Sequence, residues 1–188
     1  MTGELPDPAY TTEPLDPLKH DREAFSCGVE QVDNFFKRTA NKLGKADNAR
    51  VFVLTGGEGR VLGFYALNSH DVDVGDLPKS YKRTAPNSGL IPAAYLSMIG
   101  VDRRYVGHGL GGSLLIDALM RIERASREVG IAVVVLDILD CGDPQMVERR
   151  KRLYAGYGFQ PFPSMPLRMF LPMKVVRALL AAEEAATD

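Results

Sequence analysis

Tryptophan is absent from this 188-residue sequence, and only two cysteines are present, Cys27 and Cys141. The cysteines have none of the short paired spacings of a structural zinc site, so a metal-held or disulfide-rich fold is not expected. No apolar run approaches the roughly 18 residues that a bilayer span requires, and the N-terminus has no signal-peptide pattern. These absences indicate a protein of the reduced cytoplasm without membrane association.

Charge is nearly balanced over the whole chain, with 23 Lys and Arg against 24 Asp and Glu, but its distribution is uneven. The segment 144–177 carries seven Lys and Arg residues against the single Glu148. Such a segment can face phosphates, or it can be an ordinary solvated helix face. If it binds nucleic acid, the expected contacts are Arg149, Arg150, Arg152 and Arg168.

Length and composition fit a single soluble domain. We expect a poorly ordered tail at 1–12, one domain over 13–175, and a C-terminal helix and tail at 176–188. The apolar patterns predict a mixed α/β (α+β) fold with a right-handed crossover between two parallel strands. The expected strands are 13–18, 51–54, 61–67, 93–101, 131–138 and 170–173, and 70–91 is expected to be a loop.

Four helices are predicted from apolar residues at helical spacing. The first begins at Phe25, with Ser26 or Gly28 as its cap. The second follows Gly112 and should bury one face, and the third begins at Pro144 and ends near 156–158. The fourth covers 175–186. The expected buried face of the second helix consists of Leu114, Leu115, Ala118, Leu119, Ile122 and Ala125.

A glycine-rich turn is the most informative local feature. The strand 93–101 is followed by Gly107-His108-Gly109-Leu110-Gly111-Gly112, and a helix opens directly after it. Unpaired backbone N–H groups and the helix dipole at such a turn favour a pyrophosphate group. No lysine follows, as a P-loop requires, and the spacing is not that of a dinucleotide fold. A tight turn without a ligand is the alternative.

The stretch V-D-x-x-x-x-G-x-G-x-G-x-x-L-L resembles the acetyl-CoA-binding signature of GNAT N-acetyltransferases. Val106 takes the position that is usually Gln or Arg, which leaves main-chain amides to bind the pyrophosphate. The resemblance implies a GNAT-like mixed central β-sheet flanked by helices, with a splayed parallel strand pair that binds acetyl-CoA. The implied cofactor-binding residues are Ile99, Gly100, Val101, Val106, Gly107, His108, Gly109, Leu110, Gly111 and Gly112. Arg103 or Arg104 could reach the ribose phosphate.

A second signature, Leu153-Tyr154-Ala-Gly-Tyr-Gly158-Phe159, is similar to the element that carries the catalytic tyrosine in GNAT enzymes. The resemblance implies that Tyr154 protonates the departing thiolate, while a main-chain N–H of 97–101 binds the thioester oxygen. The alternative is a buried tyrosine whose hydroxyl is satisfied locally. His70, Asp71 or a water chain could act as the base, and no sequence motif favours one of them. The three histidines form no metal set.

The N-terminal motif Phe25-x-Cys27-Gly28-x-x-x-Val32-Asp33 resembles one GNAT branch, the bacterial toxins that acetylate the amino group of aminoacyl-tRNA. Met98 departs from that branch, where arginine is usual. The resemblance implies an aminoacyl-tRNA substrate, a small antitoxin partner and a homodimer. Two other functions stay open: acetylation of a small-molecule amine or protein lysine, and a non-catalytic acyl-CoA-binding module.

Overall fold

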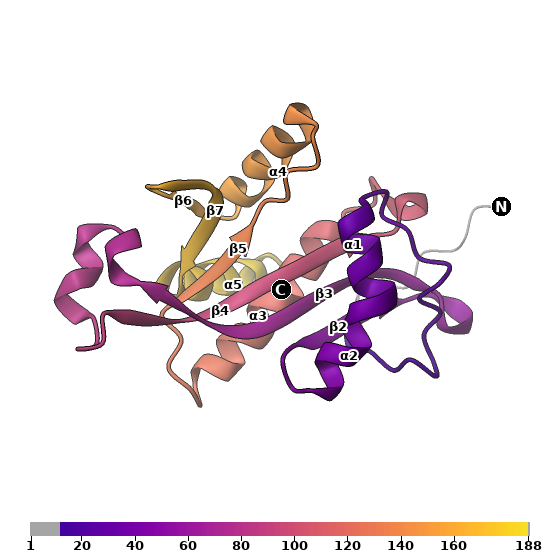
Figure 1. Ribbon diagram of the computed structural model, residues 1–188, viewed down its shortest axis with the longest axis horizontal. Helices are drawn as coiled ribbons and strands as arrows, with labels where there is room; N and C mark the ends of the chain where they lie inside the picture. The colour runs from indigo at the N-terminus through magenta and orange to yellow at the C-terminus, as the bar shows by residue number, and fades with distance from the viewer. Residues whose placement is uncertain (1–11, 188) are drawn as a thin grey trace. The chain divides into compact units, whose positions relative to one another are not determined.

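The computed structural model describes residues 12–187 (Figure 1) and consists of two compact units. One unit contains the described residues up to Asn68 together with Ser97–Ala118, and the other contains Ser69–Leu96 and the residues from Leu119 onward. Residues 1–11 of the expected tail lie outside the described residues. Within 12–187, no helix has the length and apolar character needed to cross a membrane.

Seven strands form one mixed sheet in the order β1-β2-β3-β4-β5-β7-β6. The pair β4–β5 is parallel, while β1–β2, β2–β3, β5–β7 and β6–β7 are antiparallel. The mixed α/β class with a parallel strand pair is therefore confirmed. In chain order the elements are β1 (Thr12–Pro14), α1 (Glu30–Asn34), α2 (Ala40–Lys45), β2 (Arg50–Thr55), β3 (Val61–Asp73), β4 (Leu90–Val101), α3 (Leu110–Ser126), β5 (Val133–Asp137), α4 (Pro144–Gly156), β6 (Gln160–Phe162), β7 (Met165–Pro172) and α5 (Met173–Thr187).

The first helix begins later than predicted and has no side-chain cap. It starts at Glu30 with Val29 at the N-cap position, so the prediction of Ser26 or Gly28 as the cap is wrong. The Ser26 hydroxyl instead donates to Asp33, and Gly28 has a φ of +83° that places it in the preceding turn. One π-helical turn at 35–39 joins α1 to α2.

The predicted loop 70–91 is largely regular structure. β3 continues to Asp73 and β4 already begins at Leu90, with two short 3₁₀ turns between them. Polar residues in this stretch interrupt the apolar pattern from which strand ends are predicted. The apolar residues Val72, Leu77 and Ile91 are nevertheless buried in one core cluster with residues of β5, β6 and β7, and this long-range packing extends the strands.

The helix α3 buries the predicted face with one exception. Leu114, Leu115, Ala118, Leu119 and Ile122 are buried, whereas Ala125 is exposed. The helix ends at Ser126, so Ala125 lies in its last turn beyond the packed region. The strand β6 was not predicted, because three residues carry too little alternation to be recognised.

The N-terminal part of the first unit is held by aromatic packing. Phe25, Phe36 and Phe64 are fully buried, and the ring of Phe64 stacks on Phe36 at a centroid distance of 4.2 Å. Phe25 meets both rings edge-on, an arrangement that aromatic quadrupoles favour. This cluster fixes the π-helical turn after α1 and the segment before α1 against β3.

Candidate acetyl-CoA site

The glycine turn leads from the end of β4 into α3, within the first unit. After a short 3₁₀ turn at 103–105, Gly107 and Gly109 adopt φ angles of +92° and +76°, a region that side chains with a Cβ rarely occupy. A Cβ added at either glycine would meet no atom within 4 Å. The glycines are therefore required by the backbone conformation, and they leave open space in front of the helix N-terminus.

Main-chain N–H groups face this open space. In the described part of the chain, the amides of Leu110, Gly111 and Gly112 have no hydrogen-bond acceptor, as expected for the first turn of a helix. Together with the N-terminal dipole of the 17-residue helix α3, they suit a pyrophosphate group. The turn therefore fits the phosphates of acetyl-CoA by its open space and its unpaired donors.

Side chains of the turn contribute less than its main chain. Leu110 is only 1% exposed, so its side chain belongs to the core and only its amide faces outward. Val106 is 57% exposed, and its side chain offers no hydrogen-bond donor. His108 is exposed, with Nδ1 lying 3.1 Å from the carbonyl oxygen of Tyr105.

The last part of β4 extends beyond its pairing with β5. The parallel register runs from Ala93–Val133 to Leu96–Leu136 and stops there. Residues 97–101, which include Ile99 and Val101, continue the strand without β5 beside them. Gly100 has a separate reason to be glycine, because a Cβ there would lie 3.0 Å from the Val32 side chain and 3.3 Å from Phe64. The unpaired edge is suited to bind the pantetheine and the thioester oxygen.

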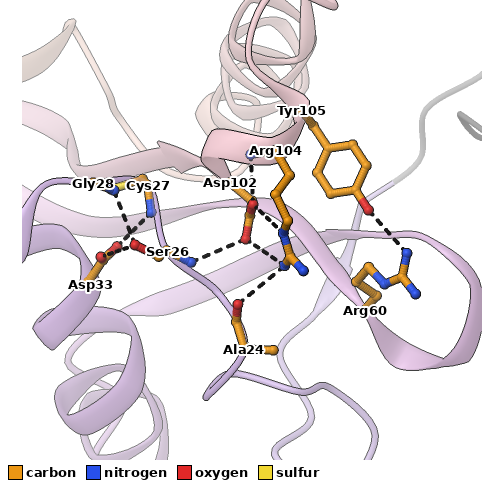
Figure 2. A network of polar contacts seen from close by, with 9 residues as sticks. All are labelled: Ala24, Ser26, Cys27, Gly28, Asp33, Arg60, Asp102, Arg104 and Tyr105. Carbon is orange, nitrogen blue, oxygen red and sulfur yellow. Dashed lines mark hydrogen bonds and ion pairs between the residues drawn. The ribbon is translucent and has the colours of Figure 1, made fainter. Parts of the chain in front are cut away.

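A buried carboxylate holds the start of the turn (Figure 2). Asp102 is 1% exposed and accepts hydrogen bonds from the Ser26 amide at 3.1 Å and from the Arg104 amide at 3.0 Å. The Arg104 guanidinium adds two bonds at 2.8 Å. Burial opposes ionisation of Asp102, but these donors hold the pKa of its carboxyl below its ordinary value. Arg104 is thus bound to Asp102 rather than free for a ribose phosphate, and Arg103 is exposed.

A second carboxylate orders the segment that Asp102 holds (Figure 2). Asp33 accepts from the Ser26 hydroxyl at 2.7 Å and from the Cys27 amide at 2.8 Å. Burial raises the pKa of the Cys27 thiol to about 12, so this cysteine is a poor nucleophile at neutral pH. We did not predict either aspartate as a functional residue. The feature of the sequence that could have identified them is their position in the two motifs that carry the family resemblance.

Replacing Asp102 by asparagine is expected to lower the free energy of unfolding by about 1–3 kcal/mol, because charge-assisted bonds to Arg104 are lost. Urea denaturation at neutral pH measures this. A depressed carboxyl pKa stabilises the fold above the unfolded value near 3.9, and that contribution disappears as pH falls through the folded value. The difference between wild type and variant should therefore shrink below about pH 4. An unchanged urea midpoint at pH 7 would contradict this role.

Tyr154 lies near the end of α4, in the second unit. Its side chain is 8% exposed, and its ring meets Phe159 edge-on at 5.8 Å. Among residues 12–187 the hydroxyl has no hydrogen-bond partner, and no buried polar side-chain atom in that range is left unpaired, so the hydroxyl oxygen reaches solvent. Burial raises its pKa to about 12, partly offset by the charge of Arg150. The alternative for this tyrosine, a hydroxyl that is hydrogen-bonded to a neighbouring residue, is therefore not found in the described part of the chain.

The four predicted nucleic-acid contacts differ in their freedom to bind phosphate. Arg149 is exposed and makes no ion pair in the described chain. Arg152 pairs with Glu148 at 3.2 Å on an exposed face. Arg150 donates to the carbonyl oxygen of Leu139 at 3.1 Å. Arg149 therefore remains available for phosphate. Arg152 is paired with Glu148, and Arg150 is bound to a carbonyl oxygen of the preceding loop.

Arg168 belongs to a polar cluster on the sheet. Its guanidinium forms a two-bond pair with Asp137 at 2.8 and 2.9 Å, and Asp137 also accepts from the Tyr95 hydroxyl at 2.7 Å. The Tyr95 ring lies 5.2 Å from that of His70. Arg168, followed by Tyr95, holds the pKa of Asp137 below its ordinary value. Arg168 is therefore engaged by a carboxylate, and His70 points to this cluster while Asp71 is exposed.

Comparison with known proteins places these features in context. No family model matches the chain. It is 60% identical over 169 residues to "Probable toxin TacT" of Sinorhizobium fredii, covering 89% of this chain and 93% of the relative. It is 33% identical over 160 residues to "tRNA-acetylating toxin" of Mycobacterium tuberculosis, covering 85% and 90%.

Solved structures agree with these relatives. The structure of AtaT complexed with acetyl-methionyl-tRNAfMet superposes with a TM-score of 0.78 at 26% identity, covering 90% of this chain and 98% of that one. The structure of AtaTR bound with AcCoA has a TM-score of 0.71 at 25% identity, covering 90% and 96%. Sequence and fold thus point to the same group of proteins over nearly the whole described chain.

Proposed function

This chain belongs to the family of tRNA-acetylating toxins, and from that premise we propose that it transfers the acetyl group of acetyl-CoA to the amino group of an aminoacyl-tRNA. The single observation that carries the proposal is the glycine turn, whose unpaired amides at Leu110, Gly111 and Gly112 face open space at a helix N-terminus. One relative, 33% identical to this chain, is named a tRNA-acetylating toxin, and a similar solved structure holds acetyl-methionyl-tRNAfMet.

Each part of the chain has a defined task in this reaction. The amides of the turn hold the pyrophosphate, and the unpaired edge of 97–101 offers an N–H to the oxygen on which negative charge develops. Acetyl-CoA, when bound, supplies a thioester whose acyl carbon accepts the amine and whose thiolate departs. An α-amino group has a pKa near 8, so roughly a tenth of it is neutral at pH 7 and can react without a dedicated base.

Tyr154 serves as the donor to the departing sulfur. Its pKa of about 12 keeps the hydroxyl protonated at every physiological pH. An ordinary thiol has a pKa near 8.5, so full transfer of the tyrosine proton is uphill in this environment. Tyr154 is therefore a hydrogen-bond donor that stabilises the developing thiolate. The proton that the attacking amine loses is available to protonate the thiolate.

The partners follow from the same proposal. A small antitoxin, a homodimer and a cytoplasmic location are part of it, and they rest on the resemblance of the N-terminal motif, Phe25 to Asp33, to the toxin branch. Asp33 and Asp102 give that motif a structural task, because they join it to the start of the cofactor turn.

The test is acetyl transfer from labelled acetyl-CoA to a mixture of aminoacylated tRNAs, with polyamines and lysine peptides in parallel. Label on tRNA that is released by deacylation is the expected result, and it identifies the accepting amino acid. Label on free amines or peptides alone would establish the second function, acetylation of a small amine or protein lysine. Acetyl-CoA binding without any transfer would leave a non-catalytic module.

A further inference from the structure

A groove on the N-terminal helices is lined mainly by cationic side chains. It measures about 440 Å³ and lies in the first unit. Its seven lining residues are Arg22, Lys37, Arg38, Asn41, Lys42, Lys45 and Ala46. Five of them are positively charged and none is acidic, although the whole chain has a net charge of −1.

The helix phase explains how these side chains come together. Val32, Phe36 and Ala40 are buried and hold α1 and α2 (Figure 1) on the sheet. Arg38 lies three residues before Asn41 and four before Lys42, and Lys45 lies three residues after Lys42 and four after Asn41. This spacing places all four on one solvent-facing side. Arg22 arrives from the preceding loop and donates to the carbonyl oxygen of Lys37 at 2.9 Å.

The cations in the groove form no close pair with a carboxylate. In the described chain, Lys37, Arg38, Lys42 and Lys45 form no ion pair, whereas Arg152 and Arg168 elsewhere do. The nearby carboxylates bind other groups, although the charge of Lys37 also contributes to lowering the pKa of Asp33. Asp33 binds Ser26 and Cys27, Asp47 pairs with Arg50 at 2.7 Å, and Asp21 accepts from the amides of Glu23 and Ala24.

Stability of the helix accounts for only part of this arrangement. Cations in the last turn of a helix interact favourably with its dipole, which covers Lys42 and Lys45. Arg22 donates to the carbonyl oxygens of Phe36 and Lys37. Arg38 has no such role, and like charges four residues apart, as in Arg38 and Lys42, destabilise a helix by a few tenths of a kcal/mol. A surface that concentrates unpaired positive charge at a cost in stability is suited to a polyanionic partner.

We infer that this groove binds the phosphate backbone of the tRNA substrate. The inference rests on the proposed function and adds a contact surface to it. Arg38 to Lys45 spans about 10 Å along the helix axis, enough to face two or more successive phosphates of a strand. Lysine and arginine side chains neutralise phosphates without reading bases, so the groove contributes affinity for tRNA in general and leaves the choice of amino acid to the acceptor site.

The test compares the double variant Arg38→Gln/Lys42→Gln with the control Arg124→Gln/Lys82→Gln. Both pairs replace one exposed arginine and one exposed lysine, so the change in net charge is the same. The probe is deacylated tRNA with a fluorescent 5′ label, measured by anisotropy at several salt concentrations. The groove variant is expected to bind roughly 5–20-fold more weakly at about 100 mM salt, with a slope of log Kd against log salt that is smaller by about 1–2. The control is expected to bind as wild type.

Turnover distinguishes the groove from the catalytic site. The aminoacyl-adenosine ester of the accepting amino acid carries the reacting amine without the tRNA backbone, so the groove variant should acetylate it at the wild-type rate. Binding of deacylated tRNA involves no acetyl transfer, so the anisotropy measurement tests the groove even if no aminoacyl-tRNA is acetylated. Absence of acetylation would refute only the proposed function. Equal weakening by both double variants, or wild-type affinity in the groove variant, would overturn the inference. Loss of binding to a polyglutamate peptide with unchanged tRNA affinity would assign the groove to an acidic protein segment instead.

Discussion

Replacing Tyr154 by phenylalanine is expected to lower kcat for acetyl transfer at least tenfold and to leave the Kd for acetyl-CoA within about threefold. The ring stays in place because Phe159 and the end of α4 hold it, so only the hydroxyl is lost. That hydroxyl has no partner among the described residues, and its removal leaves no buried group unpaired. Single-turnover rates and isothermal titration with acetyl-CoA measure the two effects separately.

The matched control for this change is Tyr157→Phe, which removes a hydroxyl three residues further along the chain from a half-buried tyrosine. Its kcat should equal that of wild type. If both variants transfer acetyl groups at the wild-type rate, Tyr154 is a structural residue. If only the affinity for acetyl-CoA changes, Tyr154 forms part of the cofactor wall and is not the donor.

The pH dependence of transfer provides a further check on Tyr154. Because burial raises its pKa to about 12, the hydroxyl remains a donor throughout the range in which the protein can be assayed. The rate should rise as the attacking amine loses its proton near pH 8 and then remain level. The raised pKa also stabilises the fold below about pH 10, and this contribution is lost as pH rises through the folded value. A fall in rate near pH 10 without unfolding would mean that Tyr154 titrates as an exposed tyrosine.

The second large effect is expected at Gly109. The variant Gly109→Asp should bind acetyl-CoA at least tenfold more weakly than Gly109→Asn. Both side chains have nearly the same size, and both residues tolerate the φ of +76° better than other side chains do. They differ in charge, and a carboxylate that extends into the open space before α3 repels the pyrophosphate by about 1–4 kcal/mol at contact distance.

Salt separates electrostatic from steric causes at this position. Titration of acetyl-CoA at low and high ionic strength should show the difference between Gly109→Asp and Gly109→Asn shrinking as salt increases, because screening weakens the repulsion. Equal affinity of the two variants at low salt would mean that the pyrophosphate does not lie at this turn. Far-ultraviolet circular dichroism of both proteins checks that α3 still forms.

Local sequence patterns were sufficient for several parts of the protein. The glycine turn, the start of α3 and the helix α4 from Pro144 to Gly156 depend on residues close together in the chain. Positive φ angles at Gly107 and Gly109 follow from glycine itself. The order of the elements and the parallel pair follow from the alternation of strand and helix patterns.

Other features depend on residues that are distant in the sequence. The polar stretch after His70 forms strand ends and 3₁₀ turns because Val72, Leu77 and Ile91 join a core with residues of β5, β6 and β7. The first helix lost its expected cap because Ser26 is held by Asp102, 76 positions away, and by Asp33. Local helix and strand propensities carry no information about such long-range contacts.

The sequence by itself determined the family and the conformation of the glycine turn, because each depends on short motifs of neighbouring residues. It predicted, from the same motifs, the cofactor role of the turn and the catalytic role of Tyr154. Only the tertiary structure decided which basic side chains are free. It pairs Arg104 with Asp102 and Arg168 with Asp137, and it places Arg22 beside Lys37 and the cations of α2. The physical reason is that an ion pair is strong only at short range, so the availability of a charge depends on which residues the fold brings within about 4 Å of it.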